Sequence, residues 1–424
     1  MQTKKKYNLP LWIGIALLAG IAVGIILWLI MGAEAAAAVT GKYVKPVGDI
    51  FIGLLKWIVV PVVLLSIMDG VISMNDIRKV GKVGGLTVVY FLATTLIACV
   101  IGLIVANIFK GFFPNLAGDL GDKVYEGATS NDWITVIKNI FPSNAVEPFS
   151  GSISDSKFSG SIMLQIIVIA LFFGCGIIVA GEKGELAGKT VSSFNEVTQR
   201  VMMFIINVSP IAIFCTMVWV VSAKGPAILT SYAIVLGVAY LGYILHAALV
   251  YSLSVKLFAD MSPLTFFKKI WAAMAFAFAS TSSVATLPIT KECCDEMGVD
   301  SEISSFVLPL GATINMDGTA IYQCVCALFI ASCAGIPLTL GQMITIAVTA
   351  TLASIGTAGV SGAGFLMLAM VLQACNVPID FIMLVYAIDR LFDMGRTTLN
   401  IVGDASCAVC VDYWQNKKAK KQQA

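Results

Sequence analysis

Apolar runs close to the length of a bilayer crossing recur along the whole chain of 424 residues. A transmembrane helix needs about 20 predominantly apolar residues. The runs that approach this length are Trp12–Met31, Phe51–Ile72, Leu86–Ile108, Ile162–Ala180, Met202–Val221, Ala233–Leu257, Ile303–Ala331 and Phe381–Val411. The pattern therefore predicts an all-α membrane protein with eight transmembrane helices.

Polar residues interrupt the second part of the chain far more often than the first. Up to about Leu257 the predicted spans are long and uniformly apolar, whereas polar and glycine clusters break the apolar segments repeatedly between Met261 and Val411. A backbone that leaves the helix at membrane depth must find hydrogen-bond partners in protein or water. The pattern predicts broken helices in this second part, one of them at the polar cluster Gly311–Thr319 inside the seventh span.

Two of the clusters predict re-entrant helical hairpins. Ser280-Thr281-Ser282-Ser283 lies in the middle of the region Phe266–Met297, whose two arms are each too short to span and carry charges. The glycine-rich segment Ser354–Gly364 separates the apolar arms Met343–Leu352 and Phe365–Leu372. Two hairpins that enter from opposite faces, each followed by a polar span, are the inverted-repeat arrangement of secondary transporters.

Small residues also let helices pack closely without forming any site. This alternative covers the glycine cluster taken alone, but it leaves the polar side chains of the neighbouring spans unexplained. Those side chains are Asn315, Asp317, Asp393, Arg396 and Asp404.

The composition supports a membrane protein, because 58% of the residues are apolar and 12% are charged, about half the charged fraction of typical soluble domains. The net charge of +2 gives no reason to expect a nucleic-acid partner. Lysines at 4–6 precede the first predicted span, and Lys417, Lys418, Lys420 and Lys421 follow the last. The positive-inside rule then places both flanking segments in the cytoplasm, with an even number of spans in the cell (inner or plasma) membrane.

The reactive residue types give no sign of a catalytic centre. The chain has eleven cysteines, and those in the predicted spans are expected to pack as small hydrophobic residues. Cys407 and Cys410 have metal-ligand spacing but no second pair, so no metal site is expected there. His246 is the only histidine, and it is expected to pack among Leu and Ala in the sixth span rather than to relay protons.

The run from Asp389 to Asp404 places five ionisable residues inside an otherwise apolar stretch. They are Asp389, Arg390, Asp393, Arg396 and Asp404. Each charge at the centre of a bilayer costs about 2.5–3.5 kcal/mol even on the milder insertion scale. These residues must therefore face protein or a wet cavity, and they mark a candidate functional site.

Arg396 is the most informative residue of this run. Its planar guanidinium matches a carboxylate in two-point contact, and Asp393 and Asn400 share its helical face. A fixed cation, a fixed anion and an amide suit a zwitterion with an extra carboxylate. Asp393 would take the amino group, Asn400 the main carboxylate and Arg396 the side-chain carboxylate. The alternative is that Arg396 and Asp393 only neutralise each other, since a buried pair is weak evidence in itself.

A second set of polar residues offers hard oxygen atoms. Asp317, Asn315 and Asp404 suit alkali or alkaline-earth cations rather than zinc, and Thr94 and Thr95 add hydroxyl groups. Carboxylates buried in a membrane also suit protons. The residue types therefore leave sodium and proton coupling both open.

Four ordered motifs resemble those of the dicarboxylate/amino acid:cation symporter family, in its prokaryotic glutamate/aspartate transporter form. The motifs are Ala285-Thr286-Leu287-Pro288 after the Ser-rich cluster, Asn315-Met316-Asp317-Gly318-Thr319, Gly356-Thr357-Ala358-Gly359 with Gly362-Ala363-Gly364, and Asp393-Met394-Gly395-Arg396-Thr397 through Asn400 and Asp404. The resemblance covers nearly the whole chain. It implies a homotrimer in the lipid bilayer that works by an elevator mechanism.

The resemblance also implies a static and a mobile part in each protomer. Residues 1–85 (spans one and two) and 111–225 (spans four and five with the extracellular loop) would form the scaffold. Residues 86–110 (span three) and 226–424 (span six, first hairpin, span seven, second hairpin, span eight) would form the transport domain. The second hairpin would be the gate, with Val360 near its tip.

Carried over motif by motif, the resemblance assigns the site residues. The substrate would contact Arg396 through its side-chain carboxylate and Asp393 through its amino group, with Thr397, Asn400, Thr319 and Ser283 and the backbone of Ser282 and Val360 completing the pocket. One sodium site would use Asp404, Gly311 and the main chain of Asn315 and Asn400. A second would use Thr94, Thr95, Asn315 and Asp317, and a third the backbone of Thr313, Met316, Ser354, Ile355 and Thr357. Sodium would be the co-transported ion, and no organic cofactor is implied.

Two departures from the family pattern concern charge. Archaeal members carry an arginine at the position of Thr281, and animal glutamate carriers carry one at the position of Met394. Because this chain has neither, we expect a positive charge to be missing near Asp389 and Asp393. Neutral amino acid members lack the binding arginine, so Arg396 favours aspartate or glutamate as the substrate.

The leading hypothesis is sodium-coupled symport of acidic amino acids. The alternatives are proton coupling, a neutral amino acid or dicarboxylate substrate on the same fold, and an anion channel. An enzyme is not expected, because the chain offers no nucleophile with a base and no metal-binding set.

Overall fold

The computed structural model describes residues 9–79, 82–115, 144, 146–150, 160–354, 363–386 and 388–423. No β-strand occurs in these ranges, so the described chain is all-helical, as predicted. The helices of the first half are α1 (Leu9–Met31), α2 (Ala33–Tyr43), α3 (Lys45–Lys79), α4 (Lys82–Phe109), α6 (Glu147–Ser150), α7 (Gly160–Val179), α8 (Glu185–Asn207) and α9 (Ser209–Lys224).

The second half contains more and shorter helices. They are α10 (Ile228–His246), α11 (Ser252–Ala259), α12 (Pro263–Ser280), α13 (Ser283–Glu296), α14 (Ser301–Ile314), α15 (Asp317–Cys333), α16 (Leu340–Ser354), α17 (Ala363–Ala374), α18 (Ile382–Tyr386) and α19 (Asp389–Gln423). A π-helical turn, η4 (Ala247–Tyr251), connects α10 to α11. Four short 3₁₀ segments are η1 (Lys110–Phe112), η2 (Gly181–Gly184), η3 (Gly225–Ala227) and η5 (Ile379–Phe381).

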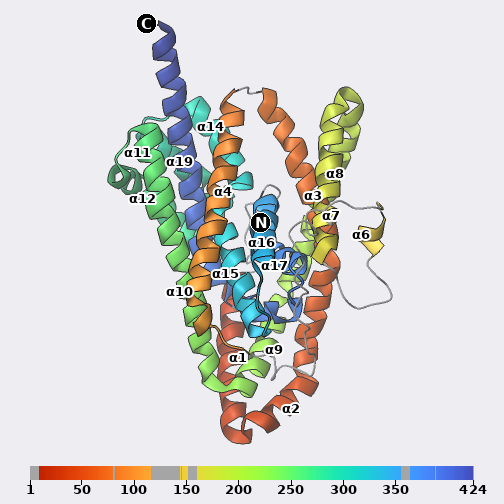
Figure 1. The fold of residues 1–424 in the computed structure, drawn as a ribbon. Helices are drawn as coiled ribbons and strands as arrows, with labels where there is room; N and C mark the ends of the chain where they lie inside the picture. Colours follow the sequence, from red (N-terminus) through yellow and green to blue (C-terminus); the bar gives the residue numbers. More distant parts are fainter. Residues whose placement is uncertain are drawn as a thin grey trace, which may run out of the picture.

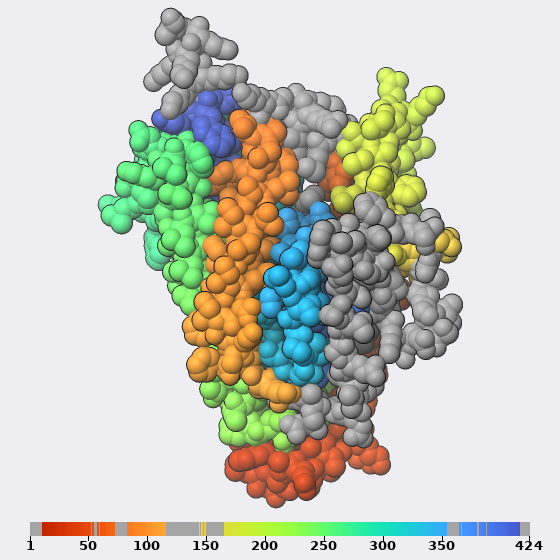
Figure 2. Space-filling model, in the orientation of Figure 1, coloured from red at the N-terminus to blue at the C-terminus, as the bar shows by residue number. Residues whose placement is uncertain are grey.

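Within the described ranges, four helical stretches are long and apolar enough to cross a membrane. They are Leu11–Met31, Val83–Phe112, Ser209–Ala259 and Ser301–Cys333, and shorter apolar helices cover Val60–Ile72, Gln165–Val179 and Leu340–Ala353. α4 lies beside α16 on the face shown in Figure 2 and exposes large apolar side chains, among them Val89, Ile104 and Ile108. Extensive apolar surface of this kind marks a protein that meets a membrane.

Two predicted spans have wrong bounds. The fifth, Met202–Val221, runs across the end of α8 at Asn207 and the start of α9 at Ser209. Pro210 explains this break, because proline lacks an N–H and fits only the first turn of a helix. The eighth, Phe381–Val411, crosses a second break between α18 and α19, and α19 continues beyond it to Gln423.

α15 lies in the interior of the molecule and contacts α4, α10, α16, α17 and α19. Sixteen of its seventeen residues are buried. α19 packs along α12, α14 and α15 and projects beyond the other helices at its C-terminal end (Figure 1). The polar residues of α15 and α19 therefore face each other inside protein, where the cost of exposure to lipid is avoided.

The break predicted within Ser280–Ser283 is confirmed. α12 ends at Ser280, and Thr281 adopts the left-handed conformation with φ 54° that commonly terminates helices. Ser282 then caps α13, since its side chain accepts a hydrogen bond from the N–H of Ala285 at 3.2 Å. α12 and α13 pack against each other as two arms joined by this turn.

The two other predicted interruptions differ in how much of them is described. α14 ends at Ile314 and α15 begins at Asp317, which confirms a broken helix at Asn315 and Met316. α16 and α17 pack against each other as the predicted arms of the second hairpin. The glycine-rich tip between them, residues 355–362, lies outside the described part of the chain.

α1 and α9 pack closely because two glycines of α1 face α9. A Cβ atom added to Gly20 would lie 2.8 Å from the Cβ of Met217, and one added to Gly24 would lie 2.7 Å from the Cβ of Val221. Glycines four residues apart let the backbones of two membrane helices approach each other in this way.

This contact predicts that Gly24→Leu destabilises the protein, by about 1–3 kcal/mol as for other overpacked sites. The measurement is the thermal unfolding midpoint of the purified protein in detergent. Gly14→Leu is the matched control, because no atom lies within 4 Å of a Cβ at Gly14. An equal midpoint for the two variants would contradict the proposed role of the glycine contact.

Candidate substrate and cation site

The polar residues of α19 form one buried face of this helix. Asp389, Asp393, Arg396, Asn400 and Asp404 follow one another at spacings of three or four residues and are all buried. Residues at these spacings lie on one side of an α-helix. The sequence prediction that Asp393, Arg396 and Asn400 share a face is confirmed, and Asp389 and Asp404 extend that face.

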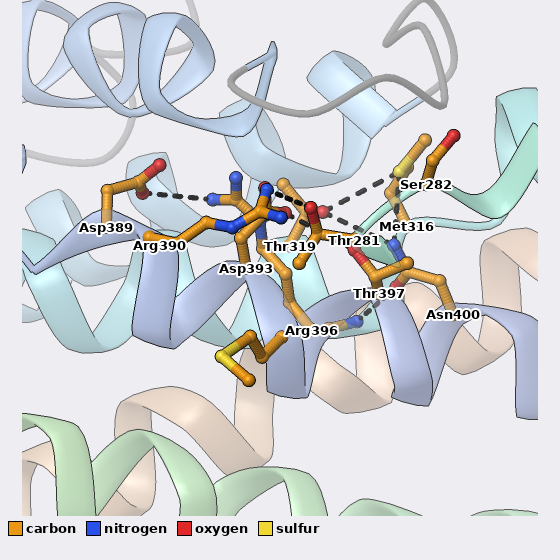
Figure 3. Close-up of polar contacts among 12 residues, drawn as sticks. Thr281, Ser282, Met316, Thr319, Asp389, Arg390, Asp393, Arg396, Thr397 and Asn400 are labelled. Carbon is orange, nitrogen blue, oxygen red and sulfur yellow. Dashed lines mark hydrogen bonds and ion pairs between the residues drawn. The ribbon is translucent and has the colours of Figure 1, made fainter. Parts of the chain in front are cut away.

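Arg396 is held between two carboxylates. Its Nε donates to Oδ1 of Asp393 at 2.8 Å, and its Nη1 donates to Oδ1 of Asp389 at 3.3 Å (Figure 3). The guanidinium also lies over the ring of Tyr322, with 4.7 Å from Cζ to the ring centroid. The contacts hold the guanidinium in place, and only 2% of Arg396 is exposed.

Two glycines allow other helices to close on Arg396. A Cβ atom added to Gly318, at the start of α15, would lie 2.4 Å from the carbonyl oxygen of Arg396. One added to Gly364, in α17, would lie 2.6 Å from Nη1 of Arg396. Real Cβ atoms essentially never come this close, so a side chain at position 318 would clash with the backbone of Arg396 and one at position 364 would displace its guanidinium. The second arm of the α16–α17 pair thus lies directly against the guanidinium.

The expectation that a charge is missing near Asp393 is wrong. Nη1 of Arg390 lies 3.9 Å from Oδ2 of Asp393 and donates a hydrogen bond to Oγ1 of Thr281 at the α12–α13 turn (Figure 3). Arg390 belongs to the first turn of α19, one residue after Asp389. The chain therefore brings a guanidinium to this turn from α19, which no spacing rule within a single helix predicts.

The remaining residues predicted to bind substrate lie around the same face. Thr397 donates from Oγ1 to Oδ1 of Asp393 at 3.3 Å. Oδ1 of Asn400 accepts from the N–H of Gly318 at 2.7 Å, and its Nδ2 lies 3.5 Å from Oγ1 of Thr319. Ser283 is buried and Ser282 is half-buried at the α12–α13 turn, whereas Val360 lies outside the described residues.

Asp404 meets the residues predicted to share a cation with it. Nδ2 of Asn315 donates to Oδ1 of Asp404 at 2.8 Å and to the carbonyl oxygen of Asn400 at 2.9 Å. A Cβ added to Gly311 would lie 2.4 Å from Oδ1 of Asp404, so α14 reaches the carboxylate only because this residue is glycine. Oδ1 of Asn315 is buried and has no hydrogen-bond partner. This unpaired amide oxygen is a ready ligand for a hard cation.

Asp317, the first residue of α15, is fully buried and accepts three hydrogen bonds. Thr95 donates to Oδ1 at 2.6 Å, and Tyr251 donates to Oδ2 at 2.8 Å. Nε2 of His246 lies 3.1 Å from the same Oδ2. Thr94 was predicted beside Thr95, but its hydroxyl donates to the carbonyl oxygen of Phe91. His246 is buried as expected, yet its partner is a carboxylate, and neither it nor Tyr251 was predicted in the site.

The third predicted cation site is only partly described. Thr313 is exposed and donates to the carbonyl oxygen of Leu310 at 2.9 Å. Met316 lies in the α14–α15 break, where its sulfur contacts Nδ2 of Asn400 at 3.3 Å. Ser354 ends α16, and the other two members, Ile355 and Thr357, lie outside the described residues.

The residues around Asp404 and Asp317 favour a hard cation over a transition metal. Across the described ranges, no cluster of three or more His, Cys, Asp and Glu side chains could hold a metal ion. Asp404 is held by the side-chain amide of Asn315, and Asp317 by the hydroxyls of Thr95 and Tyr251 and the imidazole of His246. Within the same ranges no lysine or arginine forms an ion pair with either of these two carboxylates. The carboxylates of Asp404 and Asp317 are thus held by hydrogen-bond donors without a balancing positive charge, which a bound cation would supply.

Known transport proteins are similar to this chain over most of its length. The chain is 31% identical over 420 residues to the proton/sodium-glutamate symport protein of Bacillus caldotenax, and the match covers 97% of this chain and 96% of that protein. It is 30% identical over 416 residues to the C4-dicarboxylate transport protein of Bacillus subtilis, covering 97% and 94%. It is also 33% identical over 416 residues to the neutral amino acid transporter B(0) of Bos taurus, covering 92% and 77%.

The profile of the sodium:dicarboxylate symporter family matches residues 9–414, nearly the full length of the chain. Together with the apolar helices, this match indicates a multi-pass protein of the plasma membrane. The chain belongs to the sodium:dicarboxylate symporter family.

Proposed function

We propose that this protein is a secondary active transporter that couples sodium entry to the uptake of an acidic amino acid, aspartate or glutamate. The observation that supports it best is the position of Asn400. Its main-chain oxygen binds the amide of Asn315, which contacts Asp404, while its side chain faces Gly318 and Thr319. One residue thus belongs to both the cation side and the substrate side of the site.

The charges around Arg396 support an acidic amino acid over the other two substrate classes named for the relatives. A side-chain carboxylate would pair with Arg396 and an ammonium group with Asp393, so each fixed charge gains a partner. A neutral amino acid would bring no carboxylate of its own to Arg396. A C4-dicarboxylate would bring a second negative charge toward the buried Asp393, which disfavours it.

Arg390 supports the same substrate class. With Arg390 and Arg396 the site has two cations, and with Asp389 and Asp393 it has two anions. A substrate with one net negative charge then arrives together with sodium, and the buried region gains no unbalanced charge. We propose that Arg390 holds the α12–α13 turn, through Thr281, next to the substrate.

The arrangement of helices supports the family architecture for this chain. We propose eight spans with two re-entrant hairpins, α12–α13 and α16–α17. The end of α3, the start of α4 and the C-terminal end of α19 lie at the same end of the molecule (Figure 1). Lys79 ends α3, Lys82 begins α4 and lysines follow Asn416 in α19, so the positive-inside rule assigns that end to the cytoplasm.

The same contacts support the division into a scaffold and a transport domain. α1 packs on α9, and α3 on α7, α8 and α9, within residues 1–85 and 111–225. α4 packs on α10, α15, α16 and α19, which joins residues 86–110 to residues 226–424. The second group would move across the membrane relative to the first, within a homotrimer.

Uptake of radiolabelled aspartate into proteoliposomes tests the proposed function. We expect a sodium gradient alone to drive accumulation and a proton gradient without sodium to drive none. Serine, succinate and aspartate are compared at equal concentration, and aspartate is expected to be preferred. Uptake driven by a proton gradient alone would refute sodium coupling, and equal uptake of succinate would refute the assignment of Asp393.

Arg396→Cys is expected to abolish aspartate uptake, because it removes the guanidinium that pairs with the buried carboxylates of Asp389 and Asp393. Breaking a buried ion pair costs about 3–5 kcal/mol. Serine has no side-chain carboxylate that would pair with Arg396, so the variant could retain neutral substrates of this kind. Competition of unlabelled amino acids against labelled serine measures the change. Aspartate binding that survives unaltered would show that the pocket is misplaced.

Arg390→Ala is expected to raise the half-saturating aspartate concentration about tenfold, in the range for loss of one charge-assisted contact. Arg200→Ala is the charge-matched control, because Arg200 is exposed and pairs only with Glu196 on its own helix. The double variant Arg390→Ala with Thr281→Arg returns a guanidinium to the same turn and is expected to recover affinity. Unchanged affinity in Arg390→Ala would remove Arg390 from the site.

A further inference from the structure

His246 and Tyr251 reach the same oxygen atom although they are five residues apart. Both contact Oδ2 of Asp317, His246 through Nε2 at 3.1 Å and Tyr251 through its hydroxyl at 2.8 Å. In an α-helix, residues five apart point about 140° away from each other around the axis. A regular helix from Ile228 to Ala259 would therefore bring only one of the two side chains to Asp317.

The π-helical turn Ala247–Tyr251 resolves this mismatch. The backbone N–H of Ser252 donates to the carbonyl oxygen of Ala247, five residues earlier, and the side chain of Ser252 donates to the same oxygen at 3.2 Å. An i to i+5 turn widens the helix locally, so residues five apart point in more similar directions than in an α-helix, and single turns of this kind occur frequently at functional sites. The turn begins directly after His246 and ends at Tyr251, so it aligns these two residues.

The surroundings fix both side chains in this arrangement. His246 and Tyr251 are fully buried, and their rings meet edge to face with centroids 4.8 Å apart. A Cβ added to Gly403 would lie 2.4 Å from the hydroxyl of Tyr251 and 2.5 Å from Nδ2 of Asn315. The tyrosine hydroxyl is thus packed between Asp317 and the neighbouring carboxylate site, and α19 makes room for it with a glycine.

We propose that His246 and Tyr251 are positioning residues for a cation site at Asp317, and that the π-helical turn exists to bring both to it. This inference rests on the proposed function, which gives Asp317 the role of a cation ligand. The two donors bind Oδ2, and Thr95 binds Oδ1, so the carboxylate is fixed in rotation. A fixed carboxylate lies ready to bind a cation without first reorienting, which increases affinity for the cation.

The test measures sodium binding directly, through the thermal unfolding midpoint of the purified full-length protein titrated with sodium chloride against choline chloride. A ligand that binds the folded state raises this midpoint, so the titration yields an apparent sodium affinity. We expect His246→Leu and Tyr251→Phe each to raise the half-effective sodium concentration about tenfold, the loss that one hydrogen bond to a charged group gives. Tyr251→Phe removes a single oxygen atom and guards against a misfolded His246→Leu variant.

Two controls separate positioning from structure. His246→Gln keeps a neutral N–H donor of similar reach and is expected to stay within about threefold of the unchanged protein. Tyr232→Phe removes a buried hydroxyl from the same helix that contacts only the sulfur of Met217, and it is expected to leave sodium affinity unchanged. A merely structural role would lower the midpoint in choline chloride without shifting the sodium titration.

Each outcome decides the proposal. Unchanged sodium affinity in both His246→Leu and Tyr251→Phe, with a normal response of the unchanged protein, overturns the inference and leaves the proposed function intact. A parallel loss in His246→Gln also overturns it, because a donor alone would then not suffice. No sodium response in the unchanged protein overturns the proposed sodium coupling and the inference with it.

Discussion

The cost of placing carboxylates inside a membrane protein is the constraint on which the rest of this structure depends. Asp317, Asp389, Asp393 and Asp404 are all buried in a chain whose exposed surface is largely apolar. Asp389 and Asp393 are balanced by guanidinium groups, whereas Asp317 and Asp404 are held by hydroxyl, amide and imidazole donors. Asp389 and Asp393 thus have positively charged partners in the protein, whereas the negative charges of Asp317 and Asp404 would gain from a bound cation. This difference separates substrate binding from ion binding within one polar core.

The irregular elements of the fold follow from this constraint. The α14–α15 break puts Asn315 beside Asp404 and starts a helix at Asp317, so that the positive end of the α15 dipole lies at the carboxylate. Gly311, Gly318, Gly364 and Gly403 each let a neighbouring backbone or side-chain group come closer than a side chain at that position would permit. The π-helical turn changes the angle between His246 and Tyr251 around the helix axis, so that both side chains reach Asp317.

The sequence was informative where the chemistry of a site lies within one helix, and less so where it depends on contacts between helices. The spacing of Asp393, Arg396 and Asn400 predicted a shared face, and the Ser-rich and Asn-Met-Asp clusters predicted two chain breaks, because helical periodicity and local interruptions are visible in a linear pattern. Arg390 at Thr281 was missed, since the two are joined only by tertiary packing. His246 beside Asp317 was missed for the same reason and because a π-helical turn has no recognisable sequence signal. The fifth span was misplaced because the apolar run continues across the break at Val208.

The account holds that aspartate and sodium bind to neighbouring groups joined through Asn400, so each must increase the affinity for the other. Equilibrium binding of aspartate to the purified protein, measured as sodium is replaced by choline at constant ionic strength, tests this most directly. The predicted result is an aspartate dissociation constant that falls steeply as sodium rises, by at least about fivefold, the lower end of typical coupling between sites. A dissociation constant that stays the same with and without sodium would contradict the account.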